Sequence, residues 1–370
     1  MTIEIPYQLQ VVFVLASVGA ACAVPGVFLV LRRVALVADA ISHVLLFGIV
    51  VAYFATRDLA SPWLFLGATA SGVLTVALVE LLRRTDRVAE DAAIGLVFPA
   101  LFAFGTLLAS LFLRSTHLDV DSVLLGFAEL SPFDRSEWFD FLPRSVVVLF
   151  GIFAVELFLV VLFFKELKLA TFDAALASTF GFAPVLLHYG LMTLTSVTAV
   201  AAFDAVGPVV VVALLVVPAA TGYLLTDRLD ALLALSIVLG VIGGVLGTLL
   251  ALAIDTNIAG TVASVLGLQF GLVFTVAPGR GLIAQARRGW QNRREFPERI
   301  LAIHLLQHEG TPAEDEESRL AGLHRHLHWL PGDVLRVVRR AERHGLVERR
   351  GELLAVTPAG RELARQSFGV

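Results

Sequence analysis

Residues 26–54 read GVFLVLRRVALVADAISHVLLFGIVVAYF, two apolar runs separated by Arg32 and Arg33. A helix of ~20 residues rising 1.5 Å per residue crosses the ~30 Å hydrocarbon core of a bilayer, and each run with its flanking sequence is long enough to do so. The whole chain has the same character, because 57% of its 370 residues are hydrophobic and 16% are charged. In soluble domains about a quarter of the residues are charged. The sequence therefore predicts an all-α polytopic membrane protein.

Nine apolar segments of the chain meet this length requirement. They are residues 9–31, 36–54, 62–82, 92–113, 144–164, 183–201, 206–225, 231–253 and 258–278. Arg or Lys follows each odd-numbered segment, so the positive-inside rule places the N-terminus outside the cell and the C-terminus in the cytoplasm. The prolines at 184 and 208 leave two interpretations of residues 183–208, a complete span or a broken, re-entrant segment.

Small residues recur along the apolar segments, as in SVGAACAVPG (17–26) and LGVIGGVLGTLL (239–250). Small side chains allow helices to approach closely in lipid, where packing rather than the hydrophobic effect holds helices together. We therefore expect a closely packed transmembrane domain over residues 1–279. Cys22 is the single cysteine of the chain, which excludes an intrachain disulfide.

The charge balance changes after residue 279. Residues 1–279 carry 12 Lys and Arg against 20 Asp and Glu, whereas residues 280–370 carry 16 Arg against 12 Asp and Glu. The basic residues 280–296 predict a juxtamembrane linker that contacts lipid headgroups. Residues 297–370 then contain three helical patterns, ERILAIHLLQHEG, EDEESRLAGLHRHL and PGDVLRVVRRAERHGL, before an alternating hairpin around Arg350–Gly351. This order predicts a small cytoplasmic winged helix-turn-helix domain.

Asp39 and His43 stand out because they are polar residues inside an apolar segment. As i and i+4 neighbours they project from one face of a helix. An ionised carboxylate in lipid costs ~3 kcal/mol or more, so Asp39 should face the protein interior or water and have a partner. Three interpretations are open: an interhelical hydrogen-bonded pair assisted by Ser42, a proton relay, and a site for Zn²⁺, Mn²⁺ or Fe²⁺, which accept imidazole and carboxylate ligands. Two copies of the chain at a symmetry axis would supply four ligands.

Two blocks of the sequence carry a family resemblance. Residues 26–54 and FDAVGPVVVVALLVVPAATGYLLTDRL (203–229) resemble the membrane permease of zinc, manganese and iron-uptake ABC transporters, and the similarity covers roughly residues 9–279. The resemblance implies a dimer with a second permease copy or a homologous permease, two ABC ATPase subunits inside, and an extracytoplasmic metal-binding solute receptor outside. It carries the D-x-x-S-H pattern onto Asp39 and His43 as metal ligands.

The segment ELKLATFDAALASTFGFAP (166–184) lies on the cytoplasmic side in the predicted topology. It is similar to the coupling helix that fits a groove on the ATPase in this family, while a plain surface helix between two spans is the alternative. The residues expected to make that contact are Phe172, Asp173, Leu176, Ala177 and Gly181. The chain has no G-x-x-x-x-G-K-[ST] motif, so we expect no enzymatic activity of its own and ATP hydrolysis by the partner subunit.

Three further acidic residues interrupt the apolar segments. Asp204 either lines the outer approach to the translocation path, as a possible third metal-contacting residue, or caps a helix at the membrane interface. Glu80 and Glu156 are expected to extend toward the membrane surface or to pair with basic neighbours.

The C-terminal stretch VLRVVRRAERHGLVERRGELLAVTPAGRELA (334–364) is similar to the winged helix-turn-helix of iron-dependent repressors of the DtxR type, over roughly residues 297–366. The residues that would contact phosphates or a partner are Arg336, Arg339, Arg340 and Arg343. Because acids offset much of the basic charge, a regulatory or interaction module is favoured over DNA binding, which stays open. If residues 324–328 are helical, His324 and His328 share a face and could sense a metal, or they are simply solvated.

The sequence thus predicts the permease subunit of an ATP-driven importer of divalent metal ions. Mn²⁺ is weakly favoured by the repressor-like tail, and Zn²⁺ and Fe²⁺ are alternatives because the same ligands suit all three. A cation-coupled secondary metal transporter, a vitamin or siderophore permease and a membrane-tethered winged-helix transcriptional regulator are the other functions considered.

Overall fold

The computed structural model of the chain describes residues 6–58, 61–112, 128–135 and 142–367. Its internal contacts divide it into two compact units, Met1–Arg280 and Gly281–Val370. The two units have separate hydrophobic cores.

Within the described residues, nine helices of the first unit are long and apolar enough to cross a membrane. They are α1 (Tyr7–Leu31), α2 (Leu36–Thr56), α3 (Trp63–Arg83), α4 (Glu90–Phe112), α6 (Arg144–Leu162), α9 (Pro184–Val206), α10 (Pro208–Leu225), α11 (Leu229–Ile254) and α12 (Ile258–Val276). The described connections between them include three shorter elements: η1 (Ser131–Phe133), α7 (Phe164–Phe172) and α8 (Ala174–Thr179). Each predicted span corresponds to one of the nine long helices, which confirms a multi-pass membrane protein.

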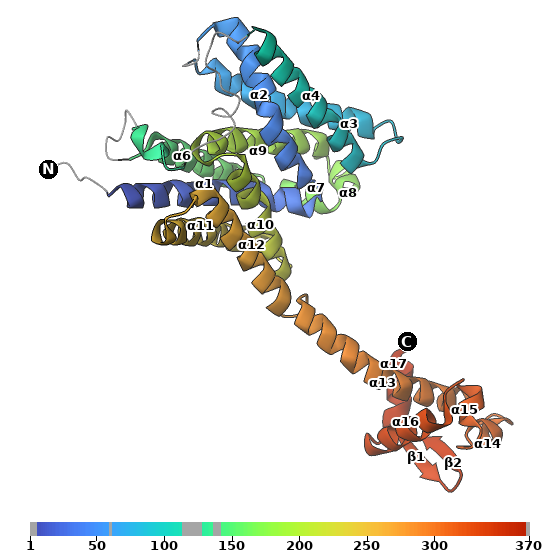
Figure 1. Cartoon of the computed structure of the whole chain (residues 1–370). Helices are drawn as coiled ribbons and strands as arrows, with labels where there is room; N and C mark the ends of the chain where they lie inside the picture. Colours follow the sequence, from blue (N-terminus) through green and yellow to red (C-terminus); the bar gives the residue numbers. More distant parts are fainter. Residues whose placement is uncertain (1–5, 59–60, 113–127, 136–141, 368–370) are drawn as a thin grey trace. The chain divides into compact units, whose positions relative to one another are not determined.

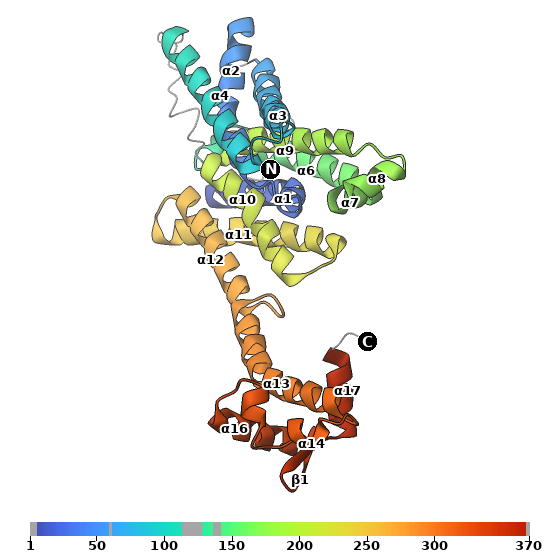
Figure 2. The same ribbon diagram turned by 90° about the vertical axis from the view of Figure 1, so that its right-hand side faces the viewer.

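Helix α1 forms the centre of the first unit. It packs against α11, α10, α6 and α9, while α2 packs against α3 and α4. Figure 1 and Figure 2 both show α1 between a group formed by α2, α3 and α4 and a second group formed by α10, α11 and α12. The side chains of Leu15, Phe28 and Leu29 on α1 are fully buried, and so is Cys22. A central helix that is buried over most of its length explains why its sequence is apolar all round.

The small residues predicted to allow close packing lie where helices meet. A Cβ atom built on Gly19 of α1 would lie 2.5 Å from the backbone oxygen of Gly240 on α11, and the reverse distance is also 2.5 Å. Between α2 and α3, a Cβ on Gly48 would lie 2.2 Å from the backbone oxygen of Gly67. Since real Cβ atoms do not approach this closely, only glycine fits at these crossings.

Residues 183–208 form two helices rather than a re-entrant loop. Helix α9 is continuous from Pro184, its first residue, and ends five residues beyond the predicted segment 183–201. It ends at Gly207, whose φ of +79° is a conformation that favours glycine, and Pro208 begins α10. Both prolines stand in the first turn of a helix, where the missing N–H has no intrahelical partner to lose.

The second unit contains five helices and one hairpin among its described residues. These are α13 (Leu282–His308), α14 (Glu314–Glu317), α15 (Leu323–His326), α16 (Pro331–Arg343), β1 (Val347–Arg350), β2 (Leu353–Val356) and α17 (Pro358–Ser367). The strands are antiparallel, with Val347 opposite Val356 and Arg350 opposite Leu353. The hairpin around Arg350–Gly351 is therefore confirmed. The core of the unit includes Leu301, Leu323 and Val338 from three different helices. Burial of each large side chain contributes roughly 1.5–3 kcal/mol.

Two features of the second unit differ from the prediction. Residues 280–296, expected as a linker, belong largely to α13, which continues through Pro297. The predicted helix EDEESRLAGLHRHL is divided into α14 and α15, because residues 318–320 between them bond to the hairpin. Leu354 N donates to Ser318 O and Leu320 N donates to Glu352 O, both at 3.0 Å. Backbone groups used in these bonds are not available for one continuous helix.

Candidate metal site and coupling surface

The Asp39–His43 pair lies at the beginning of α2. Helix α1 ends in a tight turn in which Val34 N donates to Leu29 O at 3.0 Å and Arg33 has a φ of +63°. Helix α2 starts directly after this turn, and Asp39 falls in its first turn. This turn therefore places Asp39 close to the end of α2 that adjoins α1. His43 lies one turn further along the same face of the helix.

The geometry of the pair suits a metal ion. Asp39 Oδ1 and His43 Nε2 are 3.5 Å apart, and their side chains are 47% and 39% exposed. Two ligand atoms on one tetrahedral ion with bonds of ~2.1 Å are ~3.4 Å apart. Both ligand atoms are thus nearly at the separation that such an ion requires, and they remain accessible from one side of the helix.

The surroundings of the pair are aromatic. His43 stacks on Phe98 of α4, with ring centroids 5.8 Å apart, and meets Phe102 edge-on at 5.9 Å. Ser42 is buried, and its hydroxyl donates to Ala38 O at 2.9 Å. The serine is therefore held by its own helix and does not bridge Asp39 and His43, contrary to the assisting role considered for it.

Asp204 is not part of the Asp39–His43 pair. It lies near the C-terminal end of α9, is exposed, and has Asp134 and Arg144 as the charges that act on it. The start of α1 lies at the same end of the first unit, because the Tyr7 hydroxyl donates to the backbone oxygen of Glu129, five residues before Asp134. The helix-capping interpretation is wrong, because Asp204 lies inside α9 and α10 begins after Gly207 without a side-chain cap.

The predicted coupling segment forms α7 and α8, separated by Asp173. The Asp173 carboxylate accepts a hydrogen bond from Leu176 N at 2.8 Å and so caps α8. Gly181, with a φ of +84°, ends the turn that follows α8. The two helices are thus joined by a sharp, capped corner.

One face of this corner is apolar and exposed. Phe172 is 62% exposed and Leu176 is also exposed, as expected for contact residues, whereas Ala177 is fully buried and faces inward. Ala177 therefore does not belong to the exposed face. Phe180, which is 67% exposed, does belong to it and was missed, because a single aromatic residue in a short connection has no periodicity to mark it.

Arg32 connects this corner to the turn before α2. Its Nε and Nη2 atoms each lie 3.3 Å from Thr171 Oγ1 on α7, and its Nη1 lies 3.1 Å from His188 Nδ1 on α9. Arginine only donates, so His188 Nδ1 accepts and the ring proton is on Nε2. Burial lowers the pKa of Arg32 from its ordinary value, yet the guanidinium keeps its charge.

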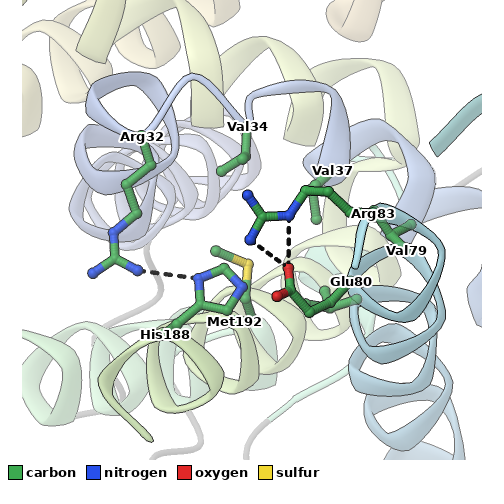
Figure 3. A pocket seen from close by; sticks show the side chains of 9 residues that line it. Arg32, Val34, Val37, Val79, Glu80, Arg83, His188 and Met192 are labelled. Atoms are coloured by element: carbon green, nitrogen blue, oxygen red, sulfur yellow. Dashed lines mark hydrogen bonds and ion pairs between the residues drawn. The ribbon is translucent and has the colours of Figure 1, made fainter. Parts of the chain in front are cut away.

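A cavity of about 180 Å³ lies beside Arg32, and its lining includes Val37 of α2, Glu80 of α3 and His188. Figure 3 shows His188 and Met192 between Arg32 and Glu80. Glu80 is paired with Arg83 at 2.7 Å and with Arg84 at 3.2 Å, which confirms the expected pairing.

Glu156 differs from its expectation. It is 1% exposed, so it does not extend toward the surface, and it pairs with no basic side chain in the part of the chain that the structure describes. Its Oε1 accepts a hydrogen bond from Thr198 of α9, while Oε2 has no hydrogen-bond partner among the described residues. Glu156 also lines an otherwise apolar cavity of about 300 Å³ between α6 and α9.

The four arginines predicted on the second unit are all on α16, but they are not equivalent. Arg336 pairs with Asp333. Arg340 Nε lies 2.7 Å from Oε1 of the buried Glu298, in a charge contact without hydrogen-bond geometry. Arg340 therefore compensates the charge of a buried carboxylate inside the second unit. The exposed arginines of this group are Arg336, Arg339 and Arg343.

His324 and His328 do not share a helical face. Helix α15 ends at His326, and His328 has a φ of +54°, so it lies outside the helix. His324 Nδ1 contacts Ala321 O at 2.9 Å. The pairing proposed for these two histidines is therefore wrong, because the helix that would align them is too short.

Comparison with known proteins identifies the first unit. The sequence model described as the ABC 3 transport family matches residues 4–277. The chain is 43% identical over 363 residues to the zinc transport system membrane protein TroD of Treponema pallidum, covering 98% of this chain and 99% of that protein. It is 39% identical over 280 residues to the manganese transport system membrane protein MntD of Bacillus subtilis, covering 75% of this chain and 95% of that protein.

A solved structure agrees with these relatives. PsaBC from Streptococcus pneumoniae in complex with Fab superposes with a TM-score of 0.63 at 26% identity, covering 75% of this chain and 94% of that chain. The chain therefore belongs to the ABC 3 transport family.

Proposed function

We propose that this chain is the permease subunit of an ATP-driven importer of divalent transition-metal ions. The observation that carries the proposal is the Asp39–His43 pair, whose ligand atoms are 3.5 Å apart and accessible on a helix of the membrane unit. Relatives described as zinc and manganese transport proteins support the substrate class. Mn²⁺ is our first choice of cargo, with Zn²⁺ or Fe²⁺ as alternatives, since imidazole and carboxylate ligands suit all three ions.

The translocation path is proposed to form between two permease subunits. One carboxylate and one imidazole are too few ligands for firm coordination, whereas the same pair from a second copy, or from a homologous permease, makes four. Exposed ligand side chains inside a membrane unit are costly unless they face a partner or water, which favours an interface at this face of α2. Asp204, at the other end of the unit, is proposed to line the outer approach, where a metal-binding receptor would deliver the ion.

The corner between α7 and α8 is proposed as the docking surface for an ABC ATPase subunit. Phe172, Leu176 and Phe180 are exposed apolar side chains of this corner. Arg32 bonds this corner to the turn before α2, so a displacement of α7 would reach the helix that carries Asp39. The positive-inside pattern of the sequence supports a cytoplasmic position for this side, where ATP is available.

The test is accumulation of radioactive Mn²⁺ and Zn²⁺ in cells that lack other uptake systems and express the chain with its ATPase and receptor. We expect His43→Ala and Asp39→Asn to abolish uptake of one metal at unchanged membrane expression. Asp255→Asn, an exposed carboxylate after α11, is the matched control and should transport normally. Unchanged uptake in both site variants would reduce the pair to a structural contact and overturn the proposal.

A further inference from the structure

Three histidines and one glutamate gather in the second unit, away from the pair on α2. His304 and His308 are one turn apart on α13, and Glu317 is the last residue of α14. One ligand atom from each of these three residues lies within 4.8 Å of the others. The rings of His304 and His308 have centroids 4.9 Å apart. Two imidazoles at i and i+4 therefore face one carboxylate from a neighbouring element.

A third imidazole completes the group. Glu317 Oε2 lies 3.4 Å from His304 Nε2 and 2.5 Å from His326 Nδ1, and His326 comes from α15. His304 Nε2 is also 3.1 Å from Glu317 O, which holds the ring beside the carboxylate. The three proposed ligand residues, His304, His308 and Glu317, are all partly buried. A carboxylate that needed only a counterion would be satisfied by His326 alone, so the convergence of two further imidazoles points to a ligand.

The donor set defines the kind of ligand. Neutral imidazole and carboxylate bind Zn²⁺ and related divalent ions at ~2.0–2.2 Å, and none of these residues is a thiolate that would select Cu(I).

We propose that His304, His308 and Glu317 bind one divalent transition-metal ion of the Zn²⁺ class, with His326 orienting the Glu317 carboxylate. The ligand atoms are up to 4.8 Å apart, so a small closure completes the site. Residues 318–320 follow Glu317 directly and form backbone hydrogen bonds with the hairpin. An ion bound at this position therefore links α13 to the segment that pairs with the hairpin. The proposal does not depend on the transport function proposed above.

The experiment uses the full-length chain, purified in detergent without a histidine tag. An Asp39→Asn/His43→Ala background removes the other candidate site, and Zn²⁺ bound after equilibrium dialysis is measured per chain. We expect one Zn²⁺ per chain in this background and none after the additional change His304→Ala/His308→Ala. His324→Ala/His328→Ala, which removes two histidines outside the cluster, is the matched control and should keep the ion.

Equal Zn²⁺ content in the two double-histidine variants would overturn the proposal. Glu317→Gln, which keeps the size of the side chain, provides a second measurement if the alanine variant fails to fold. It should weaken Zn²⁺ binding by more than tenfold, and an unchanged affinity would also overturn the proposal. The Zn²⁺ content of the chain with Asp39 and His43 intact reports the transport site in addition. Failure of the metal site proposed for the second unit is therefore distinguished from failure of the proposed transport site.

Discussion

At the scale of single residues, Glu156 is the polar group of the membrane unit whose environment is most unusual. Among the described residues, only one of its two carboxylate oxygens has a hydrogen-bond partner, the Thr198 hydroxyl, whose single proton can alternatively be donated to Leu194 O at 2.9 Å. Loss of Glu156 therefore leaves Thr198 satisfied, whereas loss of Thr198 leaves a buried carboxylate with no partner. This asymmetry predicts different outcomes for the two positions.

We expect Thr198→Val to lower the free energy of unfolding by about 1–3 kcal/mol, the cost of a buried polar group without a partner. Glu156→Leu should be neutral or stabilising, since an apolar side chain of similar size replaces an incompletely bonded acid. Thermal unfolding of the purified chain in detergent measures both. Strong destabilisation by Glu156→Leu would mean that the acid has a partner beyond Thr198.

The residue scale also shows what a sequence can reveal. Asp39 and His43 were predicted as neighbours because a four-residue spacing on a helix is sufficient to bring side chains together. Burial of Glu156 was not predictable, because α6 is apolar all round and its sequence does not indicate which side faces α1 and α9. The cluster around Glu317 joins three elements, and no local spacing marks such a contact.

At the scale of helices, the α1–α11 crossing depends on glycine. We expect Gly240→Ala to destabilise the chain by about 1–3 kcal/mol, because the added methyl would lie 2.5 Å from the backbone of Gly19 and force the helices apart. Gly267→Ala on α12 is the matched control, since its Cβ would meet nothing within 4 Å. Thermal unfolding in detergent compares the two, and equal melting temperatures would show that the crossing tolerates expansion.

The corner between α7 and α8 gives a second prediction at this scale. Arg32→Gln removes charged hydrogen bonds to Thr171 and His188, worth about 1.5–3 kcal/mol, and should slow metal uptake on the order of tenfold while ATP hydrolysis by the partner continues. Arg84→Gln is the control, because Glu80 keeps its pair with Arg83. The ratio of metal transported to ATP hydrolysed is measured in liposomes. An unchanged ratio would exclude this route between the corner and α2.

Long helices were predicted well from the sequence because hydropathy and length determine them locally. The division of residues 314–327 into α14 and α15 was missed because the deciding hydrogen bonds come from the hairpin more than 30 residues later in the chain. His324 and His328 are not aligned because α15 ends at His326 and His328 has a positive φ.

At the scale of the whole molecule, the two units have cores that share no residue. The manganese transport relative matches only 75% of this chain but 95% of its own length, so a permease of this family exists without an equivalent of the second unit. We expect a chain truncated after Arg280 to insert into the membrane and retain metal uptake within about twofold. Metal uptake by the truncated and the full-length chain is compared at matched expression levels. Complete loss of uptake by the truncated chain would show that the second unit is required for transport. Assignment of the second unit as a winged helix stays a prediction.

The full burial of Cys22 in the centre of α1 has a practical consequence for spectroscopy. Buried structural cysteines react poorly with thiol reagents, so the natural sequence needs no cysteine removal before labelling. A single cysteine introduced at the exposed position Phe180 or Arg339 would carry a fluorophore or spin label alone. The signal of that label could then follow each unit of the molecule during ATP turnover, one position at a time.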